Sequence, residues 1–174
     1  NAGTAKMAGF LASTSREHQA IHTLNTTALL RLSYAALAAF APRGRGTLIN
    51  IASILALHTL PGSAVYSASK AWVESFTRGL QDEFADSGVR IQAVLPAATA
   101  TDLWPTSGVA LDALPTGTVM TTEDLVDAAL RGLEMGEKVT LPPVHDLGLW
   151  EAFEQTRLAL FTSARTGQPA PRYR

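Results

Sequence analysis

Tyr66 and Lys70 are the two residues whose types and spacing most directly suggest chemistry. They stand four residues apart in the stretch AVYSASKAW, residues 64–72, so both side chains share one face if this stretch is helical. A phenol with an ordinary pKa of about 10 is a poor proton donor or acceptor at neutral pH. A neighbouring ammonium group lowers that pKa and makes Tyr66 usable as a general acid or base. The same spacing also occurs in surface pairs that contribute only about 0.3 kcal/mol.

Further polar residues lie where they could join this pair. The small side chains of Ser67, Ala68 and Ser69 leave room for a flat ligand to approach the backbone. The Ser53 hydroxyl could donate a hydrogen bond to an oxygen of a substrate, although a role as a helix or turn cap would also explain a serine there.

Alternating helices and strands must position these residues. Apolar residues at spacings of three and four predict helices, and apolar, partly β-branched runs predict buried parallel strands. The predicted helices cover residues 14–41, 67–86, 121–134 and 145–162, and the predicted strands cover residues 47–52, 89–96 and 138–143. This order indicates an α/β fold with a doubly wound parallel sheet, Rossmann-like, and helices on both faces. Three strands are few for such a sheet, so we expect N-terminal strands to be missing from this chain.

The carboxyl ends of the strands indicate where a ligand would bind. Open parallel sheets bind ligands in the crevice beyond those ends. Ser53 follows the first predicted strand directly, residues 96–101 follow the second, and Tyr66 and Lys70 begin the helix between them. All of these groups could therefore converge on one crevice.

Size and composition limit the possible classes of protein. The 174 residues predict one domain over residues 1–174, in which 102–120 is a long covering loop and 166–174 an extended tail. The net charge of −1 gives no reason to expect a nucleic acid or an anionic membrane as partner. The sequence has no cysteine, no signal peptide and no apolar run long enough to span a membrane, so we expect a cytoplasmic protein. Two histidines, His18 and His22, share a helix face, but no third ligand accompanies them and no metal is predicted.

Five pieces of the sequence, in order and in register, resemble the short-chain dehydrogenase/reductase family. The matched pieces are Asn1-Ala2-Gly3, Asn25, Ser53, Tyr66 with Lys70, and PAATAT at residues 96–101. The resemblance extends over the chain up to about Pro143. Each motif is weak when it stands alone, whereas five in register form a specific pattern.

The resemblance implies roles for four catalytic residues. Tyr66 would protonate the substrate carbonyl oxygen during reduction and act as the base during oxidation. Lys70 would lower the pKa of Tyr66 and hydrogen-bond the nicotinamide ribose, and Ser53 would polarise the carbonyl. Asn25 would sit at a local distortion of its helix and hold a water that links Lys70 to solvent.

The resemblance also implies contacts to NAD or NADP, between which the sequence does not choose. Asn1, Ala2 and Gly3 would lie beside the adenosine ribose. In the segment that begins at Pro96 and Ala97, the backbone of Thr99 and the side chain of Thr101 would contact the nicotinamide carboxamide or the phosphates.

Two departures from the family pattern accompany these matches. Ala97 stands where the family usually has glycine, and its methyl group restricts the backbone. The glycine-rich phosphate turn, Gly-x-Gly-x-x-Gly, does not occur in the sequence. In the family this turn precedes the position of Asn1, so half of a dinucleotide site would be absent if the chain began there.

The function implied by the resemblance is NAD(P)-dependent interconversion of a ketone or aldehyde with an alcohol. Apolar residues in the loop 102–120 suggest a small apolar or aromatic substrate; they are Leu103, Trp104, Val109, Leu111, Leu114 and Met120. The helices over 14–41 and 67–86 form the dimer contact in the family, so a homodimer or homotetramer is expected. Two alternatives stay open: an epimerase or dehydratase that uses the same pair with tightly bound NAD, and a non-catalytic or truncated dinucleotide-binding module.

Overall fold

The computed structural model describes residues 2–174, which form two units that divide between Pro143 and Val144. Each unit is described by itself below. Asn1, for which the sequence predicts a cofactor contact, lies outside the described residues. None of the helices in the described part is long and apolar enough to cross a membrane.

The first unit is built on a parallel sheet. Within the described residues its strands are β1 (Gly46–Ile51), β2 (Val89–Val94) and β3 (Val139–Thr140), in that order across the sheet. All pairs are parallel, as the sequence predicts, and Ile51 lies opposite Val94. This register brings the carboxyl ends of β1 and β2 to the same level, because each strand ends at that pair.

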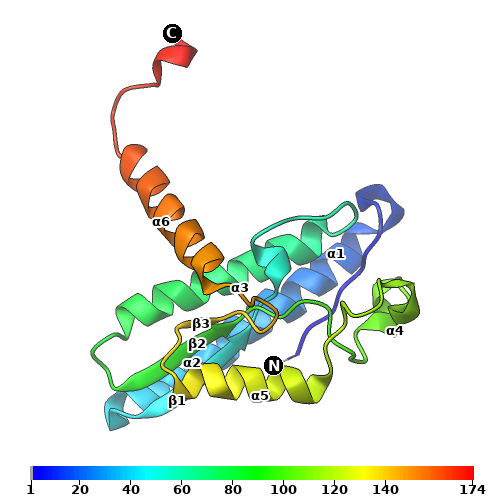
Figure 1. Cartoon of the computed structure of the whole chain (residues 1–174), viewed down its shortest axis with the longest axis horizontal. Helices are drawn as coiled ribbons and strands as arrows, with labels where there is room; N and C mark the ends of the chain where they lie inside the picture. The colour runs from blue at the N-terminus through cyan, green and yellow to red at the C-terminus, as the bar shows by residue number, and fades with distance from the viewer. Residues whose placement is uncertain (1) are drawn as a thin grey trace. The chain divides into compact units, whose positions relative to one another are not determined.

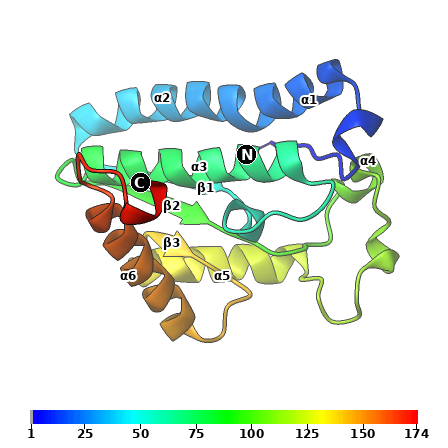
Figure 2. The same ribbon diagram turned by 90° about the horizontal axis from the view of Figure 1, so that it is seen from above.

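Helices cover both faces of this sheet. The predicted helix 14–41 is present as α1 (Ser15–His22), a π-helical segment (Thr23–Ala28) and α2 (Leu29–Phe40), which follow one another without a break. This helix runs beside α3 (Ala64–Glu83), and the strands lie between α3 and α5 (Thr122–Glu134) in both views (Figures 1 and 2). The sequence therefore predicts the layers correctly.

The helix starts follow from local chemistry. Thr14 caps α1 in a capping box, in which its hydroxyl accepts from the Glu17 N–H while the Glu17 carboxylate accepts from the Thr14 N–H. Thr121 caps α5 in the same position relative to Asp124. These caps satisfy N–H groups that the helix itself leaves without a partner.

The sheet-facing stripe of α3 is more polar than its sequence suggests. Apolar residues recur at helical spacing along this helix at Val73, Phe76, Leu80 and Phe84, but only Val73 is fully buried. The buried stripe instead contains Tyr66, Lys70, Val73, Thr77 and Gln81. Hydrogen bonds make this possible, since Asn50 Nδ2 donates to Thr77 Oγ1 at 3.0 Å and Gln81 Nε2 donates to Ile91 O at 3.1 Å.

The segment between β2 and α5 is less irregular than predicted. It contains α4 (Trp104–Ser107) and a 3₁₀ turn at Leu111–Ala113. Its end returns to its beginning, because Thr99 and Met120 form a parallel β-bridge. We call residues 102–120 the lid segment.

The second unit, residues 144–174, contains α6 (Leu147–Ser163) and a 3₁₀ turn at Pro171–Tyr173 within the tail. The apolar residues of this helix do not form a single stripe. Leu147, Leu158 and Phe161 point to one side of a helix with 3.6 residues per turn, and Leu149, Phe153 and Leu160 point to the opposite side. None of residues 144–174, all of which the structure describes, is buried.

Candidate active site

Tyr66 and Lys70 lie on the buried stripe of α3, one turn apart, at the end of β1. Their exposed fractions are only 8% and 6%. Lys70 Nζ lies 5.7 Å from the centroid of the Tyr66 ring and donates a hydrogen bond to the carbonyl oxygen of Ile51 at 3.0 Å. Burial lowers the pKa of Lys70 from 10.5 to about 8. The amine is therefore charged at neutral pH, but its pKa lies only about one unit above that pH.

The pKa of Tyr66 moves in the direction opposite to the one expected from the sequence. Burial raises the pKa of the phenol, because the phenolate would lose solvation, and a hydrogen bond with the Ser53 side chain opposes that rise. The cause is that α3 turns Tyr66 inward, which a spacing of four residues does not reveal. Tyr66 is thus a protonated acid at neutral pH.

Ser53 connects the end of β1 to the end of β2. Its Oγ accepts a hydrogen bond from the Leu55 N–H at 3.1 Å, which begins a 3₁₀ turn. The Ile54 N–H donates to Pro96 O at 3.0 Å, and Ser53 Oγ lies 3.5 Å from the same oxygen. Ser53 has one hydroxyl proton, so it can donate a hydrogen bond either to Pro96 O or to the Tyr66 oxygen. The turn-cap role and the position beside Tyr66 therefore occur together.

Asn25 lies in the π-helical segment, so the expected local distortion of the helix is present. Its side chain is 2% exposed, and its amide group is fully engaged. Oδ1 accepts from the Thr4 N–H at 2.9 Å, while Nδ2 donates to Thr4 O and to Ser69 Oγ, both at 2.9 Å. The side chain therefore holds other parts of the site, and both of its N–H donors are used by the protein itself.

Gly3 brings the N-terminal segment into this cluster. A Cβ atom at Gly3 would lie 3.4 Å from Asn25 Oδ1 and 3.7 Å from Lys70 Nζ. Ala2 and Gly3 are both exposed. The segment after residue 1 thus passes directly beside the Lys70 ammonium group.

The residues after β2 form a second wall. Thr99 is buried, and its hydroxyl donates to Ala97 O at 3.2 Å, whereas Thr101 is exposed and its oxygen accepts from the Leu103 N–H at 3.4 Å. The Thr99 main-chain N–H has no hydrogen-bond partner among the described residues. Within that same part of the chain only glycines adopt positive φ, so Ala97 fits here without backbone strain.

Sequence reasoning missed the role of Ser69. Its hydroxyl accepts from Asn25 and donates to the Tyr66 carbonyl oxygen at 2.7 Å. Ser67 pairs with Ser63, their oxygens 2.8 Å apart. The expectation that Ser67 and Ser69 leave space for a ligand is therefore wrong, because both are buried and hydrogen-bonded. Their small size suggests space, and only their burial on α3 indicates that both hydroxyls are hydrogen-bonded.

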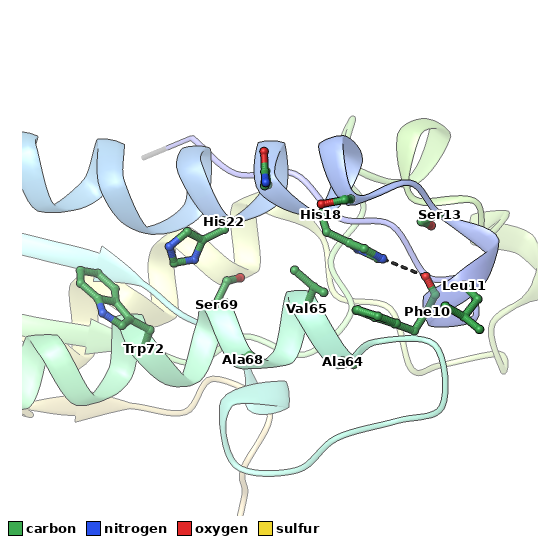
Figure 3. Close-up of a pocket in the computed structure, with 12 residues that line it drawn as sticks. Phe10, Leu11, Ser13, His18, His22, Ala64, Val65, Ala68, Ser69 and Trp72 are labelled. Carbon is green, nitrogen blue, oxygen red and sulfur yellow. Dashed lines mark hydrogen bonds between the residues drawn. The ribbon is translucent and has the colours of Figure 1, made fainter.

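A separate groove of about 680 Å³ lies between α1 and the first half of α3 (Figure 3). Val65, Ala68 and Trp72 form one side, and His18 and His22 form the other. The His18 ring stacks on Phe10 with ring centroids 4.6 Å apart, and its Nε2 lies 2.9 Å from Phe10 O. Across the described residues no group of three His, Cys, Asp or Glu side chains could hold a metal ion. The two histidines are thus part of a largely apolar groove wall.

The lowered pKa of Lys70 predicts how stability depends on pH. At pH 7 the amine is charged in the folded and the unfolded states, and the folded state bears the cost of burying the charge. Between about pH 8 and pH 10.5 the unfolded state binds more protons, so stability rises with pH. Relative to a Lys70→Met variant, the natural protein should gain roughly 2 kcal/mol of unfolding free energy from pH 7 to pH 10.

Urea unfolding of both proteins at several pH values measures this difference. Tyr66 is present in both, so its own titration cancels to first order. A difference that stays constant, or that moves against Lys70 with rising pH, would contradict the burial of a charged amine at this site.

Comparison with known proteins identifies the family. A sequence model described as short chain dehydrogenase matches residues 1–110. A short-chain dehydrogenase from Sphingobium yanoikuyae, solved in complex with NADPH, is 41% identical with a TM-score of 0.94; the match covers 100% of this chain and 67% of that chain. The bulky-bulky ketone specific alcohol dehydrogenase from Comamonas testosteroni is 37% identical with a TM-score of 0.86, over 99% of this chain and 65% of that one.

A curated relative gives the same result. The 3alpha-hydroxysteroid dehydrogenase of Mediterraneibacter gnavus is 31% identical over 135 residues, which are 75% of this chain and 54% of the relative. The chain spans less than two thirds of the length of the first curated relatives that it matches. The structural matches confirm the Rossmann-like fold. This chain belongs to the short-chain dehydrogenase family.

Proposed function

We propose that the protein is an NAD(P)-dependent oxidoreductase that interconverts a ketone or aldehyde with the corresponding alcohol. The observation that carries the proposal is the arrangement of Ser53, Tyr66 and Lys70. Two hydroxyl groups within hydrogen-bonding contact lie at the carboxyl ends of parallel strands, next to a buried amine. Such a pair of hydroxyls can bind one carbonyl oxygen.

Tyr66 acts as the general acid in reduction. Because its pKa is raised, the phenol holds its proton at neutral pH and gives it to the substrate oxygen as negative charge develops there. Ser53 donates a hydrogen bond from its hydroxyl to the same oxygen, keeps its own proton and orients the carbonyl. In oxidation Tyr66 must first lose its proton, so that direction is favoured by high pH. When bound, a nicotinamide cofactor supplies the hydride in reduction and accepts it in oxidation.

The residues present fit such a cofactor at its nicotinamide end. The Thr99 N–H is an unused donor suited to the carboxamide oxygen, and the charged Lys70 is a donor suited to a ribose hydroxyl. Gly3 has no side chain, which leaves the surroundings of Lys70 Nζ open. We include Ala2, Pro96, Ala97 and Thr101 in the proposed contact surface, with Asn25 as the residue that fixes its geometry. Both NAD and NADP are candidates, and the Sphingobium yanoikuyae relative was solved with NADPH.

The proposed substrate is an apolar ketone. All seven large apolar side chains of the lid segment are half-buried: Leu103, Trp104, Val109, Leu111, Leu114, Val119 and Met120. They give the lid an apolar inner surface that would bury a hydrocarbon group and exclude water. The Comamonas testosteroni relative is described as specific for bulky-bulky ketones. We therefore propose ketones with bulky apolar substituents on both sides.

We also propose that copies of the protein associate through α1, α2 and α3, as a homodimer or homotetramer. The groove between α1 and α3 is apolar, and Leu11, at its edge, is 94% exposed. On α2, Leu32 and Tyr34 are exposed. Exposed apolar side chains beside an apolar groove are typical of an interface between proteins.

Replacement of Tyr66 by Phe tests the mechanism. The variant keeps the ring and removes the proton that reaches the substrate oxygen, so kcat for ketone reduction should fall at least about 100-fold. The measurement follows oxidation of NADPH and of NADH with a bulky apolar ketone, using the purified natural protein. Tyr173→Phe is the matched control, because this tyrosine is 72% exposed and lies in the tail; it should leave kcat unchanged. Equal rates for Tyr66→Phe and the natural protein would refute Tyr66 as the acid.

Replacement of Ala68 by Arg tests the interface. Ala68 is exposed on α3 and lines the groove, so a charged side chain there should disfavour association. Sedimentation equilibrium should show a dimer or tetramer for the natural protein and a smaller species for the variant. Ala85→Arg, at an exposed position after α3, is the control for the same change of charge. A monomeric natural protein would disprove this part of the proposal.

A further inference from the structure

The lid segment is attached at both ends to the residues that follow β2. The Met120 N–H donates to Ala98 O, and the Ala100 N–H donates to Met120 O, both at 2.9 Å. These bonds involve only main-chain atoms, so they place no demand on the side chains. They bring the end of the lid back to Ala98 and Ala100, the two neighbours of Thr99 in the chain.

Trp104 makes a different kind of attachment. Its indole Nε1 donates to the carbonyl oxygen of Thr99 at 2.6 Å. Of the described side chains in residues 102–120, it is the one that hydrogen-bonds the segment after β2. Trp104 is half-buried and begins α4. The lid is thus attached through a side chain at its entrance and through the main chain at its exit.

The turn that begins at Trp104 is also held from the other side. Ser107 is buried, and its hydroxyl donates to Trp104 O at 2.9 Å. Its carbonyl oxygen accepts from the Met7 N–H at 2.7 Å. Met7 lies three residues after Thr4, which the Asn25 side chain holds. The Ser107–Met7 and Asn25–Thr4 hydrogen bonds, joined by residues 4–7 of the chain, therefore connect the lid to the wall of the site that contains Gly3 and Lys70.

Thr99 takes part both in the attachment of the lid and in the proposed cofactor site. Its carbonyl oxygen accepts from Trp104, its hydroxyl is engaged with Ala97 O, and its main-chain N–H has no partner among the described residues. The direction in which that N–H points depends on the peptide unit that follows β2. The Thr99 N–H shares a planar peptide unit with Ala98 O, which the Met120 N–H holds, and Thr99 O shares the next unit with the Ala100 N–H, which Met120 O holds. The Trp104 bond to Thr99 O adds a third restraint to this pair of peptide units.

We propose that Trp104 is a positioning residue that sets the lid and the nicotinamide end of the cofactor site together, through its hydrogen bond to Thr99. This inference rests on the proposed function, in which the Thr99 N–H contacts the carboxamide. Loss of the bond releases the entrance of the lid and removes one of the three hydrogen bonds that hold the peptide units on either side of Thr99. Cofactor affinity and substrate affinity therefore fall together, while proton transfer by Tyr66 in the assembled complex is retained.

The test replaces Trp104 by Phe in the purified natural protein. Phenylalanine keeps an apolar ring and removes the N–H donor. The dissociation constant of NADPH or NADH, from its nicotinamide fluorescence, and KM for an apolar ketone should each rise roughly three- to tenfold, the loss expected for one hydrogen bond. kcat at saturation should change less than twofold, which distinguishes this variant from Tyr66→Phe. Trp150→Phe, the same exchange in α6, is the matched control and should change neither constant.

A second variant protects the test against misfolding. Substitution of residue 104 by the benzothiophene analogue of tryptophan keeps the shape of the side chain and replaces the N–H by sulfur. It should reproduce the rise in both constants with an unchanged Tm. Natural values of both constants in either folded variant would overturn the role of Trp104, and so would a rise in KM alone.

The outcomes separate the two proposals. A natural protein that reduces ketones, with Trp104 variants that match it, overturns the role of Trp104 and leaves the proposed function intact. A natural protein that binds the cofactor without reducing any ketone contradicts the proposed reaction, and the cofactor dissociation constants of the variants still decide the role of Trp104. A natural protein that neither binds a nicotinamide cofactor nor reduces a ketone overturns both.

Discussion

The hydrogen bond from the buried Lys70 ammonium to the Ile51 carbonyl is the interaction on which the site depends. A buried charge is costly unless hydrogen bonds compensate it, and a main-chain oxygen at the end of a strand has a fixed position. This bond sets α3 against the end of β1, so that Tyr66, one turn earlier, faces Ser53 immediately beyond the strand. The parallel register of β1 and β2 then brings Pro96 and the residues after it to the same edge.

Asn25 supports this arrangement from the neighbouring helix. The π-helical segment leaves the regular helical geometry locally, a distortion that is often found at functional sites. In this chain the π-helical segment contains Asn25, whose side-chain amide holds Thr4 and Ser69 through three hydrogen bonds. The Lys6–Glu17 ion pair ties the same N-terminal segment to α1. The π-helical segment thus links α3, the long helix and the segment after Gly3 through one side chain.

The sequence predicts the elements because those depend on local signals. Apolar periodicity locates α2, α3, α5 and the strands, and the spacing of Tyr66 and Lys70 predicts that both lie on one face of α3, whereas their proposed roles rest on the resemblance to the family. Properties that depend on burial could not be predicted in this way. The pKa of Tyr66 moves upward because α3 packs the phenol inward, and Thr77 and Gln81 face the sheet because partners on other elements satisfy them. The Asn25–Ser69 hydrogen bond joins residues 44 positions apart, and the Trp104–Thr99 bond depends on the path of a loop. No local sequence pattern predicts either bond.

Transfer of deuterium is the most direct measurement of the central claim. That claim is that this site binds and orients a carbonyl group for reduction by a nicotinamide cofactor. The natural protein would be incubated with NADPH or NADH carrying deuterium at C4 of the nicotinamide, together with a bulky apolar ketone, and the alcohol analysed by mass spectrometry and NMR. The account predicts one deuterium atom on the carbinol carbon, from one face of the cofactor, for each cofactor oxidised. An unlabelled product, or a cofactor that stays reduced in the presence of every ketone tried, would contradict the account and favour a non-catalytic dinucleotide-binding protein. Interconversion of isomers with no net oxidation of the cofactor would instead indicate an epimerase.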